Sequence, residues 1–165
     1  MSPMVYLVDG YNITKSDPAT AGLTLEQQRD ALIARLRSRG RDLLGAGRIV
    51  VVFDGPEEIG HPAVAAHPAL TVVFSRGESA DDVIVRRAAA ATERVVLVST
   101  DRELANRVRA HAPRGSDVRE RETLFEAAAR RRQVTRRRTK VESDVPDGAN
   151  GITEELKKLW LNDGE

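Results

Sequence analysis

The chain has 165 residues, of which 41% are hydrophobic, so it can bury the core of one globular domain and wholesale disorder is excluded. It contains no cysteine, which excludes disulfides, thiolate metal sites and a cysteine nucleophile, and its three scattered histidines disfavour zinc. The first residues carry no basic segment, and no stretch approaches the roughly 18 apolar residues that span a membrane. We therefore expect a cytoplasmic protein without a signal peptide or membrane segment.

The predicted elements alternate between strands and helices. In chain order they are a strand at residues 5–8, a helix at 24–44, a strand at 49–53, an exposed loop at 55–68, a strand at 70–74, a helix after Ser79, a strand at 95–98, a helix at 101–111, a short strand at 117–119 and a last core helix at 122–132. Thr24 with Gln27 forms a capping box, and Ser79 is placed to cap the helix that follows it.

The predicted fold is a three-layer α/β domain. Most of its strands are continuous apolar runs, which indicates that helices cover both faces of a mostly parallel sheet. We assign residues 1–132 to this domain and 133–151 to a basic run and linker. Residues 152–161 are expected to form a C-terminal amphipathic helix.

Charge is concentrated late in the chain, although the net charge is only +1. Residues 130–140 have a net charge of +7, and residues 141–165 have a net charge of −5. A run of cations without acids can bind phosphates in a salt-dependent way, but it can equally be a solvated helix end or a flexible tail. No aromatic residues are interleaved with it, so base stacking is not indicated there.

Acidic residues follow the predicted strands. They are Asp9 and Asp54 directly after two strands, Asp101 three residues after another, and Glu78, Asp81 and Asp82 around the start of the helix after the third. Because the carboxyl ends of parallel strands meet at one edge, these side chains are expected to lie together. Carboxylates held close repel each other unless a cation is present, and Mg²⁺ prefers such oxygen ligands. A bound divalent ion activates water and stabilises the departing oxygen of a phosphodiester.

Several of these acids also have an ordinary structural explanation. Asp9 and Asp54 precede glycine, as in many turns, whereas Asp82 and Asp101 suit the first turn and the N-cap of a helix. Asp81 has no such explanation. We therefore expect Asp9, Asp81 and Asp101 to form the core of a site, with Asp54 and Asp82 in support.

Three polar residues nearby have open roles. Asn12 is either a turn residue or holds Asp9 and a substrate phosphate through its side-chain amide. Ser99 either donates a hydrogen bond to the site or begins a turn. Arg76 either reaches a substrate phosphate or pairs with Glu78.

Four segments together resemble one known family. VDGYN at residues 8–12, FDG at 53–55, FSRGESADDVI at 74–84 and VSTD at 98–101 resemble the YacP-like branch of the NYN domain family, which is similar to PIN-domain nucleases. The resemblance runs in order over about residues 4–132. It implies a PIN-like three-layer fold and a ribonuclease, usually an endonuclease, that depends on Mg²⁺ or Mn²⁺.

The resemblance also implies roles for particular residues. Asp9, Asp81 and Asp101 match the metal-binding acids, and Asn12, Asp54 and Asp82 match supporting positions. In the reaction that follows from it, Asp82 or Asp54 positions the attacking water or a second ion. Glu78 and Ser99 are expected to support the site. The residues expected to draw in the RNA backbone are Arg76, Arg130, Arg131, Arg136 and Arg137.

Three other functions are alternatives to a metal-dependent ribonuclease. A non-catalytic RNA-binding module with the same fold predicts binding without cleavage. A small-molecule phosphatase would favour a DxD motif, but position 11 is a tyrosine, and a flap-type DNA nuclease needs extra helical segments for which the chain has little room. RNA is the expected partner. Because the basic run lacks stacking residues, we expect target choice to come from a larger RNA-processing or translation assembly, and we predict no oligomeric state.

Overall fold

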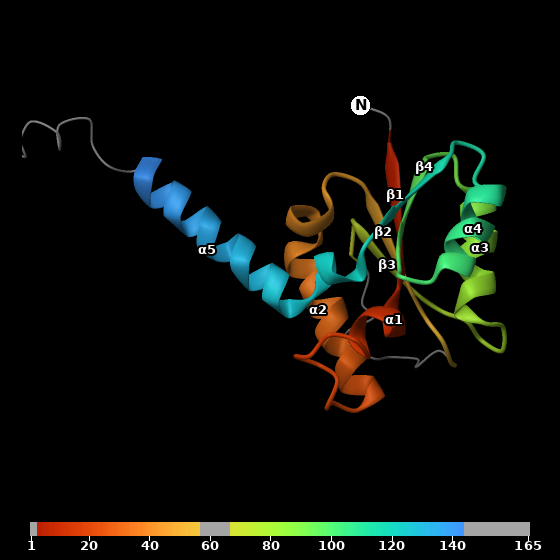
Figure 1. Ribbon diagram of the computed structural model, residues 1–165, viewed down its shortest axis with the longest axis horizontal. Coiled ribbons are helices and arrows are strands. Elements are labelled where there is room, and N and C mark those ends of the chain that lie inside the picture. Colours follow the sequence, from red (N-terminus) through yellow and green to blue (C-terminus); the bar gives the residue numbers. More distant parts are fainter. Residues whose placement is uncertain (1–2, 57–66, 144–165) are drawn as a thin grey trace, which may run out of the picture. The chain divides into compact units, whose positions relative to one another are not determined.

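Five parallel strands form the central sheet in the computed structural model, which describes residues 3–56 and 67–143 (Figure 1). The strands are β1 (Met4–Asp9), β2 (Arg48–Phe53), β3 (Leu70–Phe74), β4 (Arg94–Val98) and β5 (Ser116–Arg119). Their order is β3-β2-β1-β4-β5, and every neighbouring pair is parallel. This confirms the predicted sheet, and it places β1 at the centre with β2 and β4 on either side.

The helices are α1 (Gly10–Thr14), α2 (Leu25–Leu44), α3 (Ala80–Ala90), α4 (Arg102–His111), the 3₁₀ helix η2 (Arg121–Leu124) and α5 (Glu126–Ser143). The caps expected at the starts of α2 and α3 are confirmed. Thr24 and Gln27 form a reciprocal capping box, and the Ser79 hydroxyl accepts a hydrogen bond from the backbone N–H of Asp82 at 3.1 Å. These caps set where two of the long helices begin.

Alternate side chains of each strand pack on opposite faces of the sheet. Tyr6 and Val8 of β1 belong to a core shared with α2, whereas Val5 and Leu7 belong to a second core shared with α3 and α4. Figure 1 shows α2 on one side of the sheet and α3 with α4 on the other. The three-layer prediction is therefore confirmed, and both cores consist of buried hydrophobic side chains.

Two stretches differ from the prediction. The residues directly after Asp9, expected as a turn, form the short helix α1. The last core helix, predicted over 122–132, is instead a 3₁₀ turn followed by α5, because Phe125 between them is extended (φ −66°, ψ 152°). The break is held by tertiary contacts: the Leu124 carbonyl accepts from the Arg35 guanidinium, and the Asp17 carboxylate accepts from the backbone N–H at the start of α5.

The chain divides into two compact units, Met1–Arg130 and Arg131–Glu165, and each is considered by itself. Helix α5 continues through Ser143, so the first part of the expected linker at 133–151 is helical. Arginine, lysine and alanine are good helix formers, and no glycine or proline occurs between 126 and 143. The amphipathic helix predicted at 152–161 lies outside the described residues. Across the helices of the described chain, none is long and apolar enough to cross a membrane.

Candidate active site at the carboxyl edge of the sheet

Three carboxylates from different elements meet at the carboxyl edge of the sheet. Asp9 is the last residue of β1, Asp101 is the N-cap of α4 after β4, and Asp81 lies in the first turn of α3. The pairing of β1 with β4 aligns the first two, since Val8 lies opposite Val98. The charges of Asp81 and Asp101 both raise the pKa of Asp9. The structure therefore brings together the three acids predicted to form the core of the site.

The carboxyl group of Asp9 has a strongly raised pKa. Its pKa is raised from 3.8 to about 6, mainly because burial disfavours the charged form and next because of the charge of Asp81. The nearby backbone N–H of Asn12 and the Ser99 hydroxyl, which donates a hydrogen bond at 3.4 Å, oppose this shift. A half-buried carboxyl group whose pKa is raised to about 6 by burial and a like charge indicates a place where a cation would relieve repulsion.

A serine and an asparagine tie the loops of this edge together. The buried Ser99 hydroxyl donates to Asp9 and accepts from the backbone N–H of Asp101 at 3.1 Å, so it links two of the acids. The Asn12 side-chain oxygen accepts from the backbone N–H of Thr100 at 3.3 Å. Ser99 thus lies where a supporting residue was expected, and the amide side chain of Asn12 holds the loop after β4.

Arg107, which was not predicted to belong to the site, lies beside two of its acidic residues. Arg107 of α4 donates a hydrogen bond to Asp82, and this bond is the main reason that the pKa of Asp82 is lowered. The pKa of Asp81 is raised, first by burial and then by Asp101, while the charge of Arg107 opposes the rise. Nothing local in the sequence marks Arg107, because its partner lies on a different helix.

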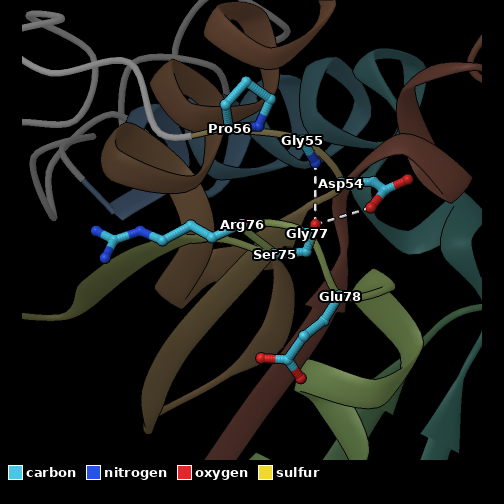
Figure 2. Close-up of a pocket in the computed structure, with 7 residues that line it drawn as sticks. All are labelled: Asp54, Gly55, Pro56, Ser75, Arg76, Gly77 and Glu78. Atoms are coloured by element: carbon cyan, nitrogen blue, oxygen red, sulfur yellow. Dashed lines mark hydrogen bonds between the residues drawn. The ribbon is translucent and has the colours of Figure 1, made fainter.

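Asp54 lies one strand away from Asp9, beside a pocket. The pocket has a volume of about 430 Å³ and is lined by Asp54, Gly55, Pro56, Ser75, Arg76, Gly77 and Glu78, from the loops after β2 and β3 (Figure 2). The Ser75 hydroxyl donates to the Asp54 carboxylate at 2.8 Å and accepts from the backbone N–H of Gly55 at 3.0 Å. Ser75 was not selected from the sequence, although it follows a strand directly, as Asp54 does.

The other predicted site residues lie in the loop between β3 and α3 and on α5. Glu78 pairs with Arg86 of α3, and Arg76, whose φ is +52°, lines the pocket. Arg130 pairs with Glu126 within α5. Arg131, Arg136 and Arg137 also lie on α5, within the second unit.

The donor set suits a hard divalent ion. All candidate ligands are carboxylate oxygens. The pKa values of Asp9 and Asp81 are raised by burial and next by a neighbouring carboxylate, Asp81 for Asp9 and Asp101 for Asp81. As the side chains stand, the described residues contain no group of three or more histidine or acidic side chains in position to hold a metal together. Carboxylate oxygens are ligands of the kind that hard divalent ions such as Mg²⁺ prefer, together with water.

Comparisons with known proteins agree with this architecture. The crystal structure of Rae1 (YacP) from Bacillus subtilis is 24% identical to this chain in sequence. The alignment covers 94% of this chain and 91% of the Rae1 chain, with a TM-score of 0.61. The structure of a tryptophan-to-leucine mutant of the same Bacillus subtilis protein is 23% identical to this chain in sequence. That alignment covers 93% of this chain and 90% of the mutant chain, with a TM-score of 0.62. At this identity the likeness shows a shared fold. Among curated proteins, none matches the chain significantly.

The profile of the YacP-like NYN domain matches residues 6–160. This match extends past residue 132, where the resemblance read from the motifs was expected to end, so the basic run lies within the family's region. The fold is that of the PIN-like ribonucleases, as the motifs implied. The chain belongs to the YacP-like NYN domain family.

Proposed function

We propose that this protein is a metal-dependent ribonuclease that hydrolyses phosphodiester bonds within RNA. The observation that carries the proposal is the convergence of Asp9, Asp81 and Asp101, from three separate elements, within electrostatic reach of one another. Acids gathered at the functional edge of a parallel sheet, with pKa values raised by burial and mutual repulsion, are typical of a catalytic site that works with a cation.

In this proposal Asp9, Asp81 and Asp101 hold Mg²⁺ or Mn²⁺. When bound, the ion supplies Lewis-acid stabilisation of the phosphodiester and activation of water. Ser99 orients Asp9 through its hydrogen bond, and Asp82, whose carboxylate is kept charged by Arg107, positions the attacking water.

Binding of the RNA backbone is assigned to arginines. Arg76 lies beside the pocket next to the acids, and Arg131, Arg136 and Arg137 are helical residues of α5. Their contacts would be with phosphates, so binding should weaken as salt rises. Because such contacts carry little sequence information, we propose that target choice depends on a larger RNA-processing or translation assembly. Selective cleavage of one RNA site by the isolated protein would contradict this last point.

The test is incubation of the protein with labelled single-stranded RNA and DNA in Mg²⁺, in Mn²⁺ or in chelator. We expect cleavage of RNA that chelator abolishes and that Asp81→Asn lowers by at least about 100-fold, since even residues that support a metal ligand typically contribute about 10- to 100-fold. Asp117→Asn removes an exposed carboxylate paired with Arg94, so it is the matched control and should cleave normally. Metal-dependent cleavage by Asp81→Asn at the wild-type rate would contradict the proposed function.

A second candidate is a non-catalytic RNA-binding protein with this fold. It is favoured by one observation, namely that the described side chains as they stand form no ready-made group of three metal ligands. It predicts salt-sensitive RNA binding without cleavage in either metal, so the same incubation distinguishes the two functions.

A further inference from the structure

The pocket beside Asp54 has no role in the proposed chemistry. Its volume of about 430 Å³ lies within the range of sites that hold one small molecule, about 300 to 1,000 Å³. Its walls are the ends of β2 and β3 and the first residues of the loops that follow them. It therefore opens at the same edge of the sheet as the acids.

The pocket wall is held in a fixed backbone conformation. Arg76 adopts a φ of +52°, which is uncommon for a residue with a side chain, and Gly55 and Gly77 have φ values of +125° and +94°. The two loops are joined by a hydrogen bond from the Arg76 backbone N–H to the Gly55 carbonyl, at 3.1 Å. Non-glycine residues persist in such conformations where surrounding contacts impose them, often at ligand sites.

The chemistry of the pocket favours a ligand that donates a hydrogen bond. The exposed Asp54 carboxylate is held through Oδ1 by the Ser75 hydroxyl, and among the described residues its Oδ2 has no hydrogen-bond partner. A carboxylate accepts but cannot donate, so a hydroxyl group is a suitable partner. Figure 2 shows the Arg76 side chain extending away from Asp54, so a guanidinium suited to phosphate lies on the other side of the pocket.

The pocket lies about one nucleotide from the acids. Asp9 pairs with Val52 of the neighbouring strand, and Asp54 follows two residues later. With strands about 4.8 Å apart and about 3.3 Å per residue, the Cα atoms of Asp9 and Asp54 are roughly 8 Å apart. This spacing is comparable to one nucleotide unit of an extended strand.

We propose that this pocket binds the ribose of the nucleotide next to the cleaved phosphate, and that Asp54 accepts a hydrogen bond from its 2′-hydroxyl. The position relative to the cleaved phosphate rests on the proposed function. DNA lacks this donor, so the Asp54 carboxylate would face a negatively charged phosphodiester chain without this hydrogen bond. Asp54 therefore selects RNA both by attraction and by rejection of DNA.

The test measures binding in chelator, where no cleavage is required. Fluorescence anisotropy compares a labelled oligoribonucleotide with the oligodeoxyribonucleotide of the same sequence, both containing uracil, on the full chain. We expect at least a tenfold preference for RNA, the size of one hydrogen bond to a charged group. Asp54→Ala should abolish the preference, in part by strengthening DNA binding, and Ser75→Ala should reduce it by releasing the carboxylate. In a series of DNA oligonucleotides that each carry one ribonucleotide at a different position, the wild-type protein should bind more tightly when the ribonucleotide is at one particular position.

Glu93→Gln is the matched control, since it removes one negative charge from an exposed ion pair with Arg48 at the amino end of the strands. Its preference should equal that of the wild type. An RNA preference that survives Asp54→Ala, or the absence of measurable binding to either oligonucleotide, overturns the inference. If the preference depends on Asp54 but no metal supports cleavage, the ribose site stands and the proposed function fails. If the protein cleaves RNA but its preference for RNA is unaffected by Asp54→Ala, the proposed function stands and the ribose site fails.

Discussion

Replacing Asp9 with asparagine is expected to stabilise the metal-free protein at neutral pH. The folded protein raises the pKa of Asp9 from 3.8 to about 6, so ionisation of this group opposes folding. Asparagine has nearly the same shape, keeps a carbonyl oxygen that can accept from the Ser99 hydroxyl, and carries no charge. The substitution therefore removes the repulsion with Asp81 and the burial of a charge together.

The size of the effect follows from the pKa shift. One pKa unit corresponds to about 1.4 kcal/mol, so the shift of Asp9 corresponds to about 3 kcal/mol, and to about 2 to 3 after allowance for its partial exposure. The destabilisation is fully present above the folded pKa of about 6 and disappears as pH falls below 3.8. The advantage of Asp9→Asn should therefore be largest at pH 7.5, about 1.6 kcal/mol at pH 5, and near zero at pH 3.5.

Urea denaturation in chelator at these three pH values measures the free energy of unfolding directly. Millimolar Mg²⁺ should then stabilise the wild type and not Asp9→Asn. The control is Asp117→Asn, because Arg94 lowers the pKa of Asp117, so this change should have the opposite sign and be lost at low pH. The reasoning is refuted if Asp9→Asn is less stable than the wild type at pH 7.5, or if its advantage does not shrink with falling pH.

Three further substitutions test other parts of the structure. Asp17→Ala leaves the buried Arg35 without one of its carboxylate partners and should lower the free energy of unfolding by about 3 kcal/mol, measured in urea. Asp101→Ala removes the N-cap of α4 and should lower it by about 1 kcal/mol, whereas Asp101→Asn retains the cap. Arg107→Gln should raise the pKa of Asp81 further, which carboxyl-carbon NMR can follow, and an unchanged titration would show that Arg107 does not reach it.

The sheet and the meeting of the acids could be predicted because both depend on local pattern. Apolar runs such as residues 49–53 mark buried strands, and parallel topology then places Asp9 and Asp101 at one edge without any knowledge of side-chain contacts. The capping box at Thr24 was also predictable, because its partner lies only three residues away.

What could not be predicted depends on contacts distant in sequence. The break before α5 is held by Asp17 and Arg35, which lie about 100 residues earlier, so the local pattern at 122–132 reads as one helix. Arg107 acquires its role only because α3 and α4 pack side by side. The pocket beside Asp54 depends on the left-handed backbone of Arg76, a residue type that gives no indication of such a conformation.

The central position of β1 has a consequence for how the protein matures. Asp9 is synthesised before β4 and the start of α4, which bring Asp101 beside it and come some 90 residues later in the chain. Pairing of β1 with β4 is a contact of high sequence separation, which forms slowly in folding. A nascent chain that has not yet released residue 101 therefore carries Asp9 without Asp101, and the site comes into existence only when the centre of the sheet is complete.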